Sequence, residues 1–157
     1  MKRNEIIIAV IILAAAYLFC RWLLKIMKLK PDAADRTIEE IDKMSGTEFE
    51  EFSAAVLKGC GFIIEEMTKT TGDYGADIIA SFDGVRIAVQ CKRYHNPVGV
   101  KAVQEVISAM KHYDCEEAIV ITNSFFTKQA ETLAMDHEVV SLWNRKKLIQ
   151  MRDQAVK

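Results

Sequence analysis

Residues 72–94 read GDYGADIIASFDGVRIAVQCKRY, and the rest of the chain is organised around them. Two mainly apolar runs, 78–82 and 85–91, flank the dipeptide Asp83-Gly84. Asp-Gly between two apolar runs is typical of a two-residue hairpin turn. The stretch therefore predicts two antiparallel strands joined by a tight turn.

The hairpin brings three polar residues together. It folds Asp77, which precedes the first strand, back towards Gln90 and Lys92 on the second. Side chains alternate along a strand, so Ala88, Gln90 and Lys92 share one face, with Gln90 and Lys92 about 7 Å apart. The opposite face is an apolar core face made of Val85, Ile87, Val89 and Cys91.

Helical and strand patterns alternate on both sides of the hairpin. A helix capped by Ser45 or Thr47 carries apolar residues at helical spacing and ends near Gly59-Cys60-Gly61. The run 117–122 is short and apolar, as in a buried parallel strand. Further strands are predicted at 62–67 and 139–143, and further helices at 100–110, 127–136 and 145–152. This order predicts an α/β sandwich with a mixed sheet.

Several short motifs occur in one order and spacing between about residues 46 and 148. They are Gly46-Thr47-Glu48-Phe49-Glu50, Thr71-Gly72-Asp73-Tyr74-Gly75-Ala76-Asp77, Val89-Gln90-Cys91-Lys92-Arg93-Tyr94, Ala102-Val103-Gln104-Glu105 and Val120-Ile121-Thr122-Asn123-Ser124. Together they resemble the Mrr-type restriction endonuclease family of the PD-(D/E)xK nuclease superfamily. The resemblance implies a restriction-endonuclease-like α/β/α sandwich with a central mixed sheet.

The resemblance also implies a catalytic site made of Asp77, Gln90, Lys92 and Glu50. Gln90 stands where most of the superfamily has a second acidic residue, and Lys92 is expected to orient or help deprotonate the attacking water. The implied cofactor is Mg²⁺, with Mn²⁺ as a substitute, held by Asp77, Gln90, the Cys91 carbonyl and Glu50. Hard cations of this kind prefer such oxygen ligands.

Three of these residues also have a simpler structural interpretation. Lys92 is an ordinary strand-end lysine that extends to solvent, Asp77 caps a strand, and Glu50 is one of several acids that favour the helix dipole. The implied substrate contacts are Asp73, Arg93 and Gln104. Asp73 is also typical of a residue that supports a loop through turn hydrogen bonds.

Composition limits the classes of function. The chain of 157 residues is half hydrophobic, enough for one domain with a core. Its net charge of −1 divides into +5 for residues 1–30 and −6 for the rest, so bulk positive charge does not drive nucleic-acid binding. The four dispersed cysteines contain no CxxC pair, which argues against a zinc cluster and favours a reducing compartment.

The N-terminal segment 1–30 predicts a single transmembrane anchor with basic flanks. Residues 6–24 form an apolar stretch of nineteen residues if Arg21 extends to the interface. Roughly 17 to 25 residues span a bilayer core. A cleaved signal peptide and a buried core helix are the alternatives. The basic residues after the stretch predict that the rest of the chain stays in the cytoplasm.

Three parts are therefore expected: the anchor at 1–30, a polar connector at 31–44, and a nuclease domain at 45–157. The prediction for the whole is a membrane-anchored, Mg²⁺-dependent DNA endonuclease of restriction or genome defence. It would act as a homodimer, because cutting both strands takes two sites. The alternatives are an inactive nuclease-fold module that binds nucleic acid or a protein at the membrane, and a junction-resolving or repair nuclease.

Overall fold

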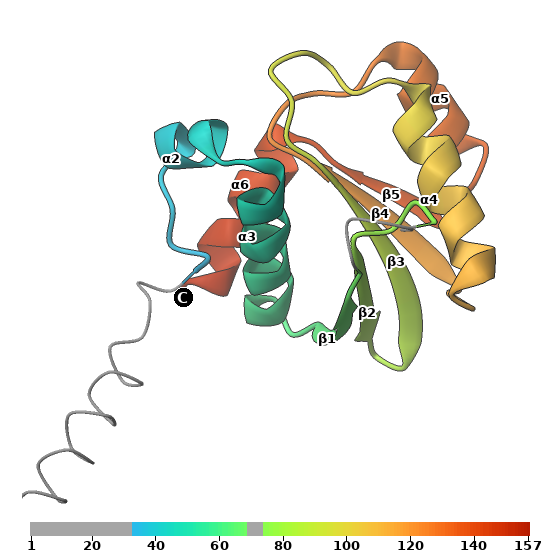
Figure 1. Ribbon diagram of the computed structural model, residues 1–157, viewed down its shortest axis with the longest axis horizontal. Coiled ribbons are helices and arrows are strands. Elements are labelled where there is room, and N and C mark those ends of the chain that lie inside the picture. Colours follow the sequence, from blue (N-terminus) through green and yellow to red (C-terminus); the bar gives the residue numbers. More distant parts are fainter. Residues whose placement is uncertain (1–32, 69–73) are drawn as a thin grey trace, which may run out of the picture. The chain divides into compact units, whose positions relative to one another are not determined.

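The computed structural model describes residues 33–68 and 74–157, and a five-stranded sheet with helices on both faces makes up this part of the chain (Figure 1). In chain order, its elements are α2 (Ile38–Lys43), α3 (Gly46–Gly59), β1 (Ile63–Met67), β2 (Ile78–Phe82), β3 (Val85–Lys92), α4 (Val100–His112), β4 (Glu117–Thr122), α5 (Lys128–Met135), β5 (Val140–Trp143) and α6 (Arg145–Ala155).

The predicted hairpin is confirmed. β2 and β3 pair antiparallel, with Ile78 opposite Val89 and Phe82 opposite Val85. Both turn residues have positive φ, 51° at Asp83 and 84° at Gly84, as a type I′ turn requires. The same register continued by one residue sets Asp77 opposite Gln90.

The sheet is mixed, as predicted. Its strand order is β1-β2-β3-β4-β5; β1 and β2 run antiparallel to their next neighbours, while β3, β4 and β5 run parallel. β4 is buried along almost its whole length because it lies between two parallel neighbours under helices on both faces.

Helices cover both faces of the sheet, which makes three layers (Figure 1). One core lies between the sheet and helices α3 and α6, and includes Phe49, Phe52 and Leu148. The other core lies between the sheet and helices α4 and α5, and includes Ala88, Val103 and Val106. Helices therefore cover both faces of β3, the face that carries Gln90 as well as the opposite, apolar face.

Side chains cap the helices that lead into the site. Ser45 accepts from the Glu48 backbone, and the Glu48 carboxylate accepts from the Ser45 backbone at 2.7 Å, so this capping box starts α3 at the predicted place. A second box, between Thr37 and Glu40, starts α2. Glu48 thus has a structural role at the helix start, which separates it from Glu50.

Helix α2 lies within the predicted connector and packs with the domain. The unit that contains the sheet begins at Ala33, and both Ala34 and Ile41 are buried in the α3 and α6 core. In the part of the chain that the structure describes, no helix combines the length and the apolar character needed to cross a bilayer. The predicted anchor lies outside the described residues and stays a prediction.

Candidate active site

Asp77 lies buried at the end of the sheet where β2 begins. Its backbone extends the β2 ladder, because its N–H donates to the Val89 carbonyl at 2.8 Å and its carbonyl accepts from the Thr68 N–H at 2.9 Å. Its Oδ2 accepts from the Gln90 amide at 2.5 Å and from the Cys91 N–H at 2.6 Å. The carboxylate is therefore fixed against the last residues of β3.

Gln90 is buried beside this carboxylate, and only the nitrogen of its side-chain amide is hydrogen-bonded within the described residues. Its Nε2 must face Asp77, because a carboxylate oxygen that already takes a second donor offers only acceptor capacity there. Its Oε1 is buried and accepts no hydrogen bond from the described residues. Unsatisfied buried acceptors are rare and costly, and they mark places where an ion or water belongs.

The donor set at this point fits a hard divalent cation. An amide oxygen beside a carboxylate matches the oxygen ligands that Mg²⁺ takes, and Mg²⁺ needs only one or two protein carboxylates. The Cys91 carbonyl lies on the same strand edge as its N–H, and this N–H donates to Asp77. No group of three or more His, Cys, Asp or Glu side chains suited to a metal lies within residues 33–68 and 74–157.

Glu50 lies on α3, and its charge acts on Cys91 at the end of β3. It is half-buried on α3, one turn before the buried Ser53. Burial raises the pKa of the Cys91 thiol well above its ordinary value, and the negative charges of Asp77 and Glu50 raise it further. The charges of both carboxylates therefore act on this one residue, which stands between Gln90 and Lys92.

Lys92 ends β3 and forms an ion pair with Glu105 of α4. Nζ lies 3.0 Å from Oε2 of Glu105, and the Lys92 side chain is 21% exposed. Burial by itself lowers the pKa of Lys92, but the Glu105 hydrogen bond and the charges of Glu105 and Asp77 outweigh burial and raise it. Lys92 is thus a cation at neutral pH.

The backbone around this lysine is fixed by the neighbouring strand. Thr122 at the end of β4 is fully buried, and its hydroxyl donates to the Lys92 carbonyl at 2.7 Å. The same hydroxyl oxygen accepts from the Ser124 N–H at 3.1 Å. The ends of the parallel strands β3 and β4 are therefore in register. This fixes the backbone position from which the Lys92 side chain extends.

Gly75 lies where the turn before Asp77 packs against helix α4. Its φ is +94°, and a Cβ built there would lie 2.8 Å from the carbonyl carbon of Glu105, closer than real Cβ contacts allow. Only glycine satisfies both conditions. The approach of the turn to α4 explains this glycine of the motif Thr71 to Asp77.

A second polar cluster ties the loops beyond β3 and β4 to α2. Arg145 makes two hydrogen bonds to the Asp42 carboxylate, at 2.6 and 2.8 Å, and Asn123 donates to the same carboxylate at 3.0 Å. The Asn123 Oδ1 accepts from the Tyr94 N–H at 2.8 Å. This cluster therefore holds the chain two residues beyond Lys92.

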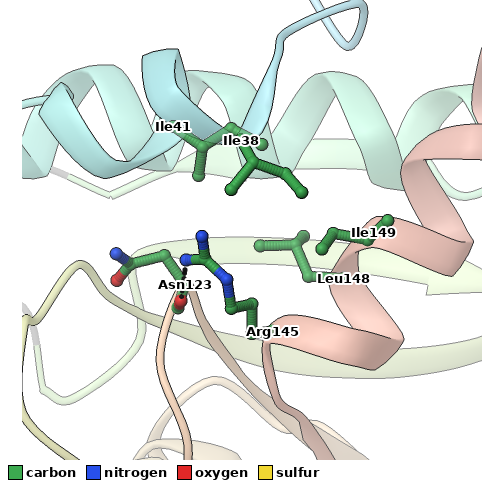
Figure 2. Close-up of a pocket in the computed structure, with 6 residues that line it drawn as sticks. All are labelled: Ile38, Ile41, Asn123, Arg145, Leu148 and Ile149. Carbon is green, nitrogen blue, oxygen red and sulfur yellow. Dashed lines mark hydrogen bonds between the residues drawn. The ribbon is translucent and has the colours of Figure 1, made fainter.

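The cluster borders a small pocket between α2 and α6. Figure 2 shows Ile38 and Ile41 of α2 facing Leu148 and Ile149 of α6, with Arg145 bonded to the carbonyl of Asn123. The pocket is lined mainly by these apolar side chains. It serves the packing of α2 rather than the chemistry around Asp77.

The structure brings three predicted catalytic residues, Asp77, Gln90 and Lys92, to one end of the sheet, and the charge of the fourth, Glu50, acts on Cys91 there. The predicted substrate contacts differ from one another. Arg93 is half-buried, with Nη1 3.1 Å from His95 and a buried Nε that has no partner among the described residues. Gln104 is exposed on α4. Asp73 lies outside the described residues.

Glu105 pairs with Lys92 but was not predicted as a site residue, although it stands in the motif of residues 102–105. One signal was present, because Lys101 and Glu105 stand four residues apart on the expected helix, at salt-bridge spacing. Asp42 and Arg145 were also missed. They are separated by 103 residues, and no local pattern relates them.

Solved structures resemble this fold. The chain superposes on a DNA modification-dependent restriction endonuclease, AspBHI, with a TM-score of 0.59 and 23% identity, covering 79% of this chain and 38% of that one. It also superposes on a protein of unknown function, AF1548, with a TM-score of 0.51 and 21% identity, covering 66% and 65%. This likeness defines the class of protein: a restriction-endonuclease-like fold.

Within that class, the chain belongs to the Mrr_cat family, described as restriction endonuclease, which matches residues 41–152. The type IV methyl-directed restriction enzyme EcoKMrr of Escherichia coli (strain K12) is 29% identical over 131 residues. That match covers 79% of this chain and 43% of the enzyme, so the chain spans less than half the length of this relative. The family resemblance expected from the motifs is confirmed.

Proposed function

We propose that this chain is a divalent-metal-dependent DNA endonuclease of restriction type. One observation carries the proposal: at the end of β3, the buried Gln90 Oε1 has no partner beside the Asp77 carboxylate, with the charged Lys92 nearby. A buried acid and amide lie beside a cation at this end of the sheet. They suit the hydrolysis of a phosphodiester.

Asp77, Gln90 Oε1, the Cys91 carbonyl and Glu50 are the groups that would hold Mg²⁺ or Mn²⁺. A divalent cation there supplies positive charge for the phosphate and the leaving oxygen. Asp77 is already oriented by two donors, so it needs little rearrangement to bind a cation. Gln90 contributes a neutral oxygen, which leaves Asp77 and Glu50 as the negative ligands.

Lys92 acts as a cation and not as a base. Its pKa is raised despite burial because Glu105 binds it, so it has no free electron pair near neutral pH. Its role is to donate hydrogen bonds that orient the attacking water and to offset charge that develops on the phosphate. Arg93, with its buried unpaired Nε, and the exposed Gln104 are proposed to contact the DNA.

Methylated DNA is the proposed substrate. The relative EcoKMrr is described as methyl-directed, but this chain spans only 43% of its length. The test is cleavage of methylated and unmethylated supercoiled plasmid by the full chain in a mild detergent, with Mg²⁺, Mn²⁺ or EDTA. Metal-dependent nicking or linearisation, stronger on methylated plasmid, supports the proposal. Equal cutting of both plasmids removes the methyl requirement, and preference for branched DNA indicates a junction nuclease instead.

We further propose that residues 6–24 tether the domain to the cytoplasmic face of a membrane. The support is the nineteen-residue apolar stretch and the basic residues after it. Alkaline extraction of membranes tests the tether, and protease added to intact cells tests the orientation. Release by alkali contradicts the tether.

A homodimer is proposed because double-strand cleavage takes two sites. Sedimentation velocity of the DNA-bound chain tests it, together with the ratio of linearised to nicked plasmid. A monomer that only nicks contradicts the dimer.

A further inference from the structure

One residue of helix α4, Glu105, contacts both Lys92 and the turn that precedes Asp77. The Glu105 carboxylate binds Lys92 at 3.0 Å, and the Glu105 backbone is in contact with Gly75, two residues before Asp77. Helix α4 is itself fixed on the sheet by Val103 and Val106, which are fully buried on either side of Glu105. The contacts of Glu105 are therefore set by a rigid element.

The ion pair with Lys92 is the stronger of two that Glu105 makes. The Lys92 and Glu105 side chains are 21% and 31% exposed, so water screens their attraction only in part. Lys101 also approaches the carboxylate, at 3.7 Å, but its side chain is 87% exposed. An exposed pair of this kind contributes little. The orienting effect of Glu105 therefore falls on Lys92.

We infer that Glu105 is a positioning residue of this site, which holds the Lys92 ammonium at a fixed place relative to the Asp77 carboxylate. The Gly75 contact fixes the separation between α4 and the Asp77 turn, and the carboxylate ties Lys92 to the same helix. Without this carboxylate, the long lysine side chain rotates freely and leaves its place beside the phosphate. A misplacement of about 1 Å costs on the order of 100-fold in rate. This inference rests on the proposed nuclease function for its kinetic consequence only.

The test is the variant Glu105→Gln in the full chain, which keeps the side-chain length and removes the charge. Glu131→Gln, an exposed change of the same kind on α5, is the matched control. The first readout is acylation of Lys92 by a small anhydride, followed by mass spectrometry with exposed Lys58 as the internal reference. The second is kcat and KM for cleavage of a labelled duplex in Mg²⁺, with kcat taken at saturating metal.

In Glu105→Gln, Lys92 acylation rises about fivefold because the ion pair no longer occupies the amine. In the same variant, kcat falls about 10- to 100-fold while KM stays within about threefold, since DNA contacts elsewhere are unchanged. Glu105→Asp keeps the charge and recovers part of kcat. Glu131→Gln behaves as wild type in both readouts.

Two results overturn the inference. One is Lys92 acylation in Glu105→Gln equal to that of the wild type, whether or not the wild type cuts DNA. The other is a kcat that stays at the wild-type value. A wild type that cuts no DNA while its Lys92 acylation still depends on Glu105 overturns the proposed function, and the hold of Glu105 on Lys92 stands.

Discussion

The Gln90 amide donates to the Asp77 carboxylate at 2.5 Å, and this contact leaves Oε1 of Gln90 buried without a partner. A glutamate at this position would put two carboxylates in contact. Gln90→Glu is therefore expected to lower the stability of the metal-free chain, because like charges repel. It is also expected to tighten Mg²⁺ binding about tenfold, because a charged ligand replaces a neutral one.

Calorimetric titration with Mg²⁺ and thermal unfolding with and without EDTA measure both effects of Gln90→Glu. Gln129→Glu on α5 is the control, since it adds the same charge to an exposed helix position. Unchanged Mg²⁺ affinity in Gln90→Glu argues against Gln90 as a ligand.

Alanine substitutions at Gly75 and Gly84 distinguish the cost of backbone strain from the cost of steric overlap. Both have positive φ, +94° and +84°, but no atom lies within 4 Å of a Cβ at Gly84, whereas a Cβ at Gly75 overlaps the Glu105 backbone. Gly84→Ala is expected to cost about 1 kcal/mol of unfolding free energy from φ alone. Gly75→Ala is expected to cost about 3 kcal/mol, because α4 must also move. Urea unfolding measures both, and equal costs rule out a tight contact between Gly75 and α4.

The Asp42 carboxylate predicts a pH dependence of stability. The Arg145 hydrogen bond lowers its pKa against the opposing effect of burial, and the Asn123 hydrogen bond lowers it further. A lowered pKa in the folded state gives stability that is present above the unfolded pKa of about 3.9 and is lost as the pH falls through the folded pKa. Since the side chain is 35% exposed, solvent screening limits this contribution to about 1 kcal/mol.

Asp42→Asn removes this contribution. Urea unfolding from pH 7 to pH 2.5 is expected to show the variant less stable than the wild type at pH 7, with the difference shrinking below about pH 4. A difference that stays constant across this range means that the Asp42 charge does not stabilise the fold.

Local patterns were sufficient to predict the hairpin and the alternation of strands and helices around it. Asp83-Gly84 determines the turn, and the turn folds Asp77 back towards Gln90 and Lys92, as the observed pairing of β2 and β3 requires. Alternating strands and helices gave the mixed sheet. Capping residues such as Ser45 gave the start of α3. In each case the cause lies within a few residues of its effect.

Contacts between distant segments could not be predicted. The pairing of Lys92 with Glu105 depends on how α4 crosses the sheet, and the pairing of Asp42 with Arg145 depends on the docking of α2. The burial of Gln90 also follows from the cover that α4 provides. Periodicity predicts that a helix is amphipathic, but it does not say which strand residue each helix residue meets.

The proposed nuclease activity is tested by comparing the wild type with Lys92→Ala in the cleavage of a labelled DNA duplex at saturating Mg²⁺. Circular dichroism and thermal unfolding first establish that both are folded. The wild type is expected to cut only with metal, and the variant is expected to lose about 1,000-fold in rate, because the cation beside the phosphate is gone. Cleavage by Lys92→Ala within about threefold of the wild type would show that Lys92 has no catalytic role.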